Sequence, residues 1–228
     1  MACMQEPNCP KYYELSAPKG FNIHKLYAFD NEGSLKKLQF FNMDMGYILA
    51  SRGTENPGAV IFKTTDGGNS WDTLTVPTNN RSPLDMQFLD ENIGIMTYYP
   101  DFSHPVVKRT EDGGQTWTEF TFSELGEGRI SNLHADTGQN LYGNLSSVYT
   151  PNRIVKSTDK GETWHIIHTL PFGSGNILGL YQNRLYLELQ GKEVRVIDLN
   201  GNHIKNFQFQ HKRGEVSDFE IIDADNII

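Results

Sequence analysis

Three short stretches of the sequence are nearly identical, and they recur at an almost constant interval. Residues 64–71 read TTDGGNSW, residues 110–117 read TEDGGQTW and residues 157–164 read STDKGETW. The tryptophans that end them lie 46 and 47 positions apart and are the three tryptophans of the chain. An interval of this size indicates repeated supersecondary units. We call the shared pattern, Ser/Thr-x-Asp-x-Gly-x-Ser/Thr-Trp, the Trp motif.

A second pattern precedes each Trp motif and completes the repeating unit. Phe40-x-Asn42-x-x-x-Gly46 is repeated 48 positions later, and weaker copies begin near residues 133, 178 and 216. Turn residues between short apolar runs predict four strands in each unit. In the first unit these strands are expected near residues 37–42, 46–52, 59–64 and 71–76. Four-stranded antiparallel units joined in series are typical of a β-propeller. The sequence therefore predicts an all-β propeller with about five blades.

The ends of the chain add an expectation about how the ring closes. Residues 12–18 resemble the strand that follows a Trp motif, although no other strand of their unit precedes them. Such an N-terminal strand can complete the last blade. The chain stops within what reads as the second strand of a fifth unit, which leaves open an incomplete five-blade ring or a truncated C-terminus. Residues 1–10 read as a flexible tether, and residues 11–228 as a single propeller domain.

The residue types of the Trp motif suit a turn between the third and fourth strands of a unit. The Asp carboxylate can accept hydrogen bonds from backbone N–H groups of its own turn, and the hydroxyl two residues earlier can bind the other limb. The second Gly can take a positive φ, and the Trp can pack between blades. We expect the stem of the Lys or Arg before each motif to cover that Trp. The structural residues are Asp66, Gly68, Trp71, Asp112, Gly114, Trp117, Asp159, Gly161 and Trp164.

The Trp motif resembles the Asp-box, or BNR repeat. This repeat occurs in sialidases, in the sortilin ectodomain, in xyloglucan-degrading glycosidases and in the photosystem II assembly factor family. The resemblance implies a propeller whose box turns lie on the outer rim, away from the ligand site. It therefore implies that Asp66, Asp112 and Asp159 are structural residues, since fold and function are separable.

Composition restricts the classes of partner. The chain has 20 Lys and Arg against 28 Asp and Glu, a formal net charge of −8, and no cluster of basic residues. Nucleic acid is therefore not an expected partner, because phosphate neutralisation needs clustered Lys and Arg. Apolar runs are only a few residues long, so no transmembrane segment is predicted.

The two cysteines, Cys3 and Cys9, both precede the first predicted strand. One interpretation is an unstructured terminus with two idle thiols. Another is that Ala2-Cys3 resembles what remains of a bacterial lipoprotein signal, which would make Cys3 a lipidation site. The protein would then be extracytoplasmic: periplasmic, on the cell surface or secreted. Two cysteines without a second ligand pair do not predict a zinc site.

Binding residues are expected in the loops at the end of the blades opposite the Trp motif, because loops are where binding residues concentrate. Arg and Tyr are favoured interface anchors. The candidates are Arg52, Arg81, Tyr99, Phe102, Arg129 and Tyr149. No catalytic residue, cofactor or metal site is predicted; His165 and His168, three apart on an expected strand, should point to opposite faces.

Three functions remain open at this point. The leading hypothesis is a non-catalytic scaffold that binds a protein or glycan. The alternative is a sialidase-like glycoside hydrolase or a carbohydrate-binding module, which as an enzyme would need an Arg cluster and a Tyr–Glu pair. The Arg-Ile-Pro sequence that the resemblance would place before the first box is missing, and the chain is short for such an enzyme. The third is a self-associating module with an open sheet edge.

Overall fold

A computed structural model of the chain describes residues 34–208, except 53–57, 78–80, 100–103, 174 and 191–192. In the described ranges sixteen strands form four antiparallel sheets of four strands each. Blade 1 contains β1 (Ser34–Phe40), β2 (Gly46–Ser51), β3 (Ala59–Thr64) and β4 (Asp72–Val76). Blade 2 contains β5 (Pro83–Phe88), β6 (Gly94–Tyr98), β7 (Val106–Thr110) and β8 (Thr118–Thr121). Blade 3 contains β9 (Arg129–Ala135), β10 (Leu141–Ser146), β11 (Arg153–Ser157) and β12 (His165–Thr169), and blade 4 contains β13 (Ile177–Tyr181), β14 (Arg184–Leu189), β15 (Glu193–Asp198) and β16 (His203–Gln208).

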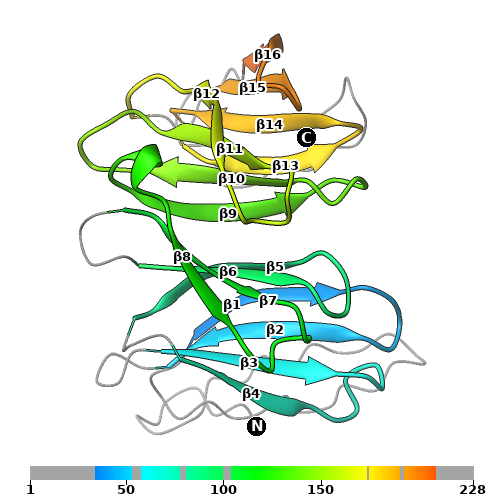
Figure 1. Cartoon of the computed structure of the whole chain (residues 1–228). Helices are drawn as coiled ribbons and strands as arrows, with labels where there is room; N and C mark the ends of the chain where they lie inside the picture. The colour runs from blue at the N-terminus through cyan, green and yellow to red at the C-terminus, as the bar shows by residue number, and fades with distance from the viewer. Residues whose placement is uncertain are drawn as a thin grey trace, which may run out of the picture.

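The sheets follow one another in chain order, from blade 1 at the bottom of Figure 1 to blade 4 at the top. Within each sheet every strand pairs with the next strand in sequence. The first strands of successive blades contact one another, β1 with β5, β5 with β9 and β9 with β13, so we call them the inner strands. The four-stranded units predicted from the repeat are thus confirmed, with four blades described. The N-terminal strand at 12–18, the tether at 1–10 and the fifth unit from residue 216 lie outside the described residues.

The apolar core lies between the blades. Tyr47 of blade 1 stacks on Phe88 of blade 2, with ring centroids 3.8 Å apart, in a cluster that both blades supply. A second cluster joins blades 2 and 3 around Trp164, and a third joins blades 3 and 4. Each of the first three sheets therefore buries one face against the next sheet. This burial explains why the strands either alternate apolar and polar residues or are apolar throughout.

The Trp motif forms the turn that the sequence predicts. In blade 2, Thr116 donates to the Asp112 carboxylate from its backbone N–H at 2.8 Å and from its hydroxyl at 2.5 Å. Thr110 also donates to Asp112 and accepts from the N–H of Gly114, both at 2.8 Å. Gly114 has a φ of 92°, and the Trp117 indole donates to its carbonyl at 3.0 Å. The other two motifs repeat this arrangement, so the Asp residues bind within their own turns.

The expectation that a basic stem covers each Trp is wrong. The Lys63 ammonium lies 5.4 Å from the Tyr47 ring centroid, and the Lys156 ammonium lies 5.5 Å from that of Tyr142. The reason is register: each Lys is the direct cross-strand partner of that Tyr, and side chains opposite each other share a face. Arg109 instead faces Ile95 and forms ion pairs with Glu111 and Glu162.

Every inner strand is interrupted by a bulge. The register shifts at residues 35–37 of β1, 83–85 of β5, 132–133 of β9 and 177–179 of β13. A bulge bends its strand and leaves backbone groups outside the ladder. The expectation that His165 and His168 point to opposite faces is wrong, because a further bulge lies in β12. The two histidines pair with Lys156 and Ile154, which are two positions apart on β11 and therefore share a face. The inner-strand bulges lie toward the end of the blades where the candidate site is found.

Candidate functional site

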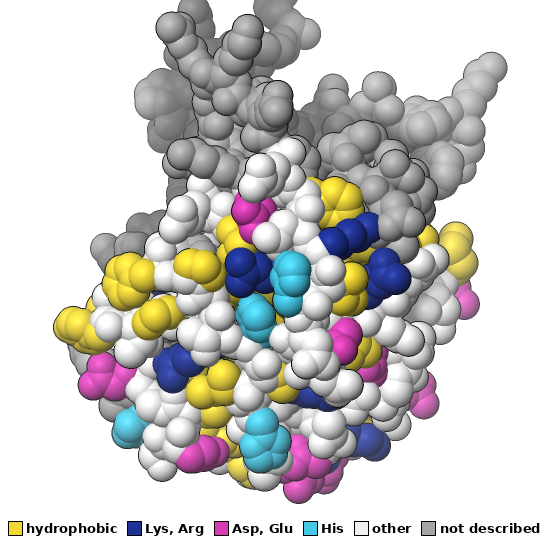
Figure 2. Space-filling model, turned by 90° about the horizontal axis from the view of Figure 1, so that it is seen from above, with side chains coloured by type: hydrophobic (Ala, Val, Ile, Leu, Met, Phe, Trp, Pro, Cys, Tyr) yellow, Lys and Arg dark blue, Asp and Glu magenta, His cyan; other side chains and the backbone are white. Residues whose placement is uncertain are grey.

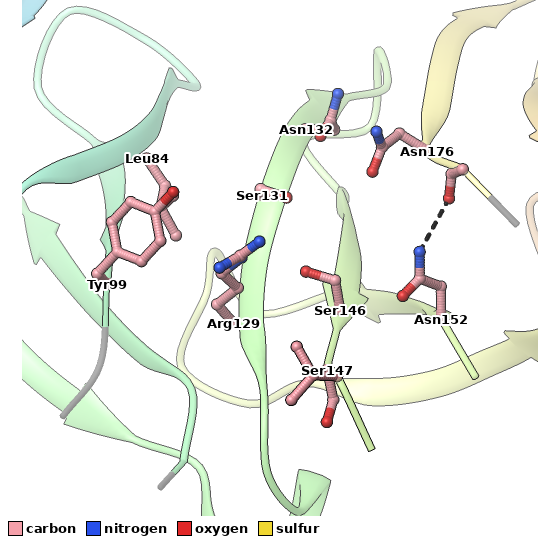
Figure 3. Close-up of a pocket in the computed structure, with 11 residues that line it drawn as sticks. Leu84, Tyr99, Arg129, Ser131, Asn132, Ser146, Ser147, Asn152 and Asn176 are labelled. Atoms are coloured by element: carbon pink, nitrogen blue, oxygen red, sulfur yellow. Dashed lines mark hydrogen bonds between the residues drawn. The ribbon is translucent and has the colours of Figure 1, made fainter. Parts of the chain in front are cut away.

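A pocket of about 460 Å³ lies at the end of blades 2, 3 and 4 opposite the Trp motif turns. Its lining comes from the start of β5, from the residue after β6, from both strands of the β9–β10 hairpin and from the segments before β11 and β13, as Figure 3 shows. The lining residues are Leu84, Tyr99, Arg129, Ser131, Asn132, Ser146, Ser147, Val148, Asn152, Gly175 and Asn176. This is the end of the blades on which the sequence placed the binding loops.

Two of the predicted binding residues meet in this pocket. The Arg129 guanidinium lies over the ring of Tyr99, 5.0 Å from its centroid. Tyr99 is 45% exposed, so the outer part of the pair is open to solvent. The aromatic ring holds one face of the guanidinium and leaves its N–H edge for a ligand.

The other predicted residues lie elsewhere. Arg52 is exposed at the start of the β2–β3 connection. The Arg81 guanidinium lies over the Tyr98 ring, with its Cζ 5.4 Å from the ring centroid. Tyr149 is 79% exposed beside the pocket but does not line it. Phe102 lies outside the described residues.

Sequence reasoning missed the amide and hydroxyl groups of the lining. Asn132 has a φ of 50° and donates a long hydrogen bond, 3.4 Å, to the carbonyl of Ile177. Asn152 donates to the carbonyl of Gly175 at 3.2 Å, the contact drawn in Figure 3. A single Asn or Ser in a strand does not by itself predict a binding site. Asn132 reaches the pocket because of the bulge in β9, and this bulge depends on the pairing of β9 with β10.

A buried asparagine orients one of the pocket amides. Asn144 is fully buried in β10, and its Nδ2 donates to the Oδ1 of Asn176 at 2.9 Å. This contact leaves the amide nitrogen of Asn176 as a donor for the pocket.

Among the residues that the structure describes, the pocket lining contains one cation and no carboxylate or imidazole. The other polar groups of these described lining residues are neutral donors and acceptors, which can bind and orient a ligand. No cluster of three or more His, Cys, Asp or Glu suited to a metal occurs in the described part of the chain. In the same ranges, no helix has the length and apolar character needed to cross a bilayer.

A Tyr–Glu pair does occur in blade 2, but neither residue is part of the pocket lining. Tyr98 donates a short hydrogen bond to Glu119, which Lys108 also contacts at 3.1 Å. Burial, and then the bond to Glu119, raise the pKa of Tyr98 well above its usual range. A nucleophilic phenol needs the opposite shift, and Tyr98 is 1% exposed. The pair is therefore a structural contact of blade 2.

Among the described residues on the face seen from above, no large region carries charge of a single sign. Figure 2 shows basic, acidic and histidine side chains interspersed among apolar ones. A face of this kind does not concentrate phosphate contacts.

Comparison with known proteins supports the assignment of the fold and gives no function. No protein-family model matches the chain, and no curated protein matches it. A structure of YCF48 bound to a D1 peptide is similar with a TM-score of 0.63 and 15% identity, covering 90% of this chain and 64% of that one. YCF48 from Cyanidioschyzon merolae gives 0.52 and 17%, covering 84% and 76%. A streptogramin B lyase gives 0.57 and 14%, covering 78% and 55%.

The chain thus spans slightly less than two thirds of the YCF48 chain that carries the peptide. At identities of this size the likeness concerns the fold alone. Because both binding proteins and an enzyme share it, the fold does not choose between them. The four described sheets and these similarities together establish an all-β, β-propeller fold.

Proposed function

We propose that this protein is a non-catalytic propeller of Asp-box repeats that binds an exposed segment of a partner protein in the pocket at Tyr99 and Arg129. The observation that carries the proposal is the lining itself. Its described residues combine one stacked arginine with serine hydroxyls and asparagine amides, and none of these described residues is a carboxylic acid or an imidazole.

The chemistry of the lining suits a peptide. Asparagine amides offer a donor and an acceptor side by side, which matches the N–H and C=O of a peptide unit. Val148 in the lining and the neighbouring Tyr149 are 80% and 79% exposed, so apolar side chains of a ligand would have a surface to cover. The volume lies within the roughly 300–1,000 Å³ typical of ligand pockets. A similar fold holds a peptide in the YCF48 structure, which supports the proposal by analogy.

Selection from a library of short random peptides displayed on phage tests this function. Peptides enriched on the wild-type protein are expected to lose about tenfold to a hundredfold in affinity with Arg129→Ala and with Tyr99→Ala, because both are central anchors. Isothermal titration calorimetry measures the loss. Arg184→Ala, at the opposite end of blade 4, is the matched control and should bind like wild type.

Three outcomes would overturn the proposal. Binding of selected peptides that survives Arg129→Ala would remove the pocket as their site. Glycans bound on an array, with no peptide enriched, would indicate a carbohydrate-binding module instead. Hydrolysis of chromogenic glycosides that is lost with Arg129→Ala would indicate the glycosidase.

The cellular location stays a proposal of its own. An extracytoplasmic protein anchored through Cys3 is supported by Ala2-Cys3 alone, and Cys3 lies outside the described residues. Mass spectrometry of the natively expressed protein would detect a diacylglyceryl group on Cys3, and an unmodified cytosolic product would contradict the proposal.

A further inference from the structure

The inner strand of blade 3 contains an irregularity that reaches the pocket. Opposite the single residue Gly143 of β10, β9 places two residues, Asn132 and Leu133. Asn132 takes the left-handed conformation, with a φ of 50°, which is uncommon for a non-glycine residue and persists only where its surroundings hold it there. Asn132 also lines the pocket. What holds this bulge therefore helps to set the shape of the site.

Two charged side chains from two earlier blades bind the backbone of the bulge. Asp85 of β5 accepts the N–H of Leu133 through Oδ2 at 2.6 Å. Lys37 of β1 donates to the carbonyl of Leu133 at 2.8 Å. The Lys37 Nζ also lies 3.0 Å from the Oδ1 of Asp85, and that oxygen accepts the N–H of Met86 at 2.7 Å. The ion pair thus satisfies both backbone groups of a residue that is itself fully buried.

The three partners occupy corresponding places, since Lys37, Asp85 and Leu133 each lie at the bulge of their inner strand. The contact therefore joins three successive blades at one level. Asp85 is buried, and a buried charge is stable only when it is paired and hydrogen-bonded. Its neighbour His134 stays neutral, because burial and then the charge of Lys37 lower the pKa of His134 to about 4. At neutral pH no second cation competes for Asp85 from this position.

We propose that Asp85 and Lys37 are positioning residues for the pocket. By binding Leu133 they fix the β9 bulge, and the bulge places Asn132 against the ligand and against the carbonyl of Ile177 in blade 4. Neither charged side chain lines the pocket. The inference rests on the proposed function of the pocket, and its effect on a ligand must pass through Asn132.

A double-mutant cycle with a selected peptide tests that route. Asn132→Gly removes the amide while glycine tolerates the φ, and Asp85→Ala removes the acceptor of the Leu133 N–H. Each change is expected to weaken peptide binding about tenfold, and the double variant should bind no more weakly than Asp85→Ala alone, because one route is lost only once. Asp66→Ala, which removes a turn acceptor at the other end of blade 1, is the control for general destabilisation and should leave affinity unchanged.

A second measurement needs no ligand. In nuclear magnetic resonance spectra, Asp85→Ala should shift the side-chain amide signals of Asn132 and speed hydrogen exchange at the Leu133 amide. Asp85→Asn keeps an acceptor at this place and should restore much of both. Losses that multiply in the double variant, or Asn132 signals that do not move with Asp85→Ala, would overturn the inference. If peptide binding survives Arg129→Ala, the proposed function fails, whereas the Asn132 and Leu133 signals still decide the positioning role.

Discussion

Trp164→Ala is expected to lower the free energy of unfolding by about 3–5 kcal/mol, the cost of emptying a large buried aromatic site. Trp164 is 1% exposed and lies in the cluster between blades 2 and 3. Its indole N–H donates to the carbonyl of Gly161 at 3.3 Å, so the truncation also removes a buried hydrogen bond. Urea unfolding followed by far-ultraviolet circular dichroism measures the loss without relying on tryptophan fluorescence.

The matched control is Trp71→Ala, which changes the same position of the same motif in blade 1. Trp71 is only partly buried and packs against the small cluster of blade 1, although its indole makes the equivalent bond to Gly68 at 3.0 Å. We expect a loss of about 1–2 kcal/mol, in proportion to the apolar area it removes from water. Equal losses at the two positions would contradict the assignment of Trp164 to a core between blades.

The blades could be predicted from the sequence because their determinants are local and repeated. The Asp112 turn depends on residues within four positions of the Asp, so the pattern of Thr, Asp and Gly specifies it without tertiary context. The same holds for Asp90, whose carboxylate accepts the N–H groups of Asn92 and Ile93 at 2.9 and 2.8 Å. Strand positions in the first unit were accordingly predicted to within three residues.

The pocket could be predicted only in part, because its residues meet through contacts between blades. Residue type and loop position predict Tyr99 and Arg129 as binding residues, but nothing in the sequence shows that they stack. Asn132 could not be predicted as a pocket residue, because its conformation follows from the β9–β10 register. The prediction for Lys63 is wrong for a related reason. Its position just before the Trp motif suggests a contact with Trp71, whereas strand pairing places Lys63 opposite Tyr47.

Charge illustrates the same dependence on context in blade 2. Arg109 and Lys108 are neighbours on β7 and both side chains are largely buried, but their carboxylate partners differ in exposure. Arg109 reaches Glu111 at 2.7 Å and Glu162 at 3.0 Å, whose side chains are 69% and 53% exposed. Lys108 has a side chain only 6% exposed, against Glu119 at 3.1 Å. Two consecutive residues thus form ion pairs with carboxylates that differ in exposure to solvent, and the contributions of these ion pairs to stability should differ.

Glu119→Ala is therefore expected to lower the free energy of unfolding by about 2–3 kcal/mol at pH 7. The change leaves the buried ammonium of Lys108 without its counter-charge and removes the acceptor of the Tyr98 hydroxyl. Breaking a fully buried pair costs about 3–5 kcal/mol, and we expect less because the side chain of Glu119 is 36% exposed. Urea unfolding measures it, with Glu111→Ala as the matched control at about 0.5 kcal/mol or less.

The contribution of Glu119 should also depend on pH. Burial alone would raise the pKa of Glu119, but the hydrogen bond from Tyr98 and the contact with Lys108 outweigh it and lower the pKa. A carboxyl with a lowered folded-state pKa stabilises the fold above its unfolded-state pKa of about 4.3, and this stabilisation disappears as the pH falls through the folded-state value. The difference between wild type and Glu119→Ala should therefore narrow below about pH 4.3.

A third variant separates the ion pair from simple packing. Lys108→Met with Glu119→Leu removes both charges and keeps apolar volume, so it should recover the part of the loss that comes from the unpaired ammonium, because no buried charge is left alone. The Tyr98 hydroxyl still lacks its acceptor in this variant, so we expect the recovery to be partial. Recovery would show that the cost lies in the stranded ammonium of Lys108. Two results would contradict this role of the ion pair between Lys108 and Glu119 in stabilising the contact of β8 with β7. One is a double variant as unstable as Glu119→Ala. The other is a loss of unfolding free energy with Glu111→Ala as large as that with Glu119→Ala.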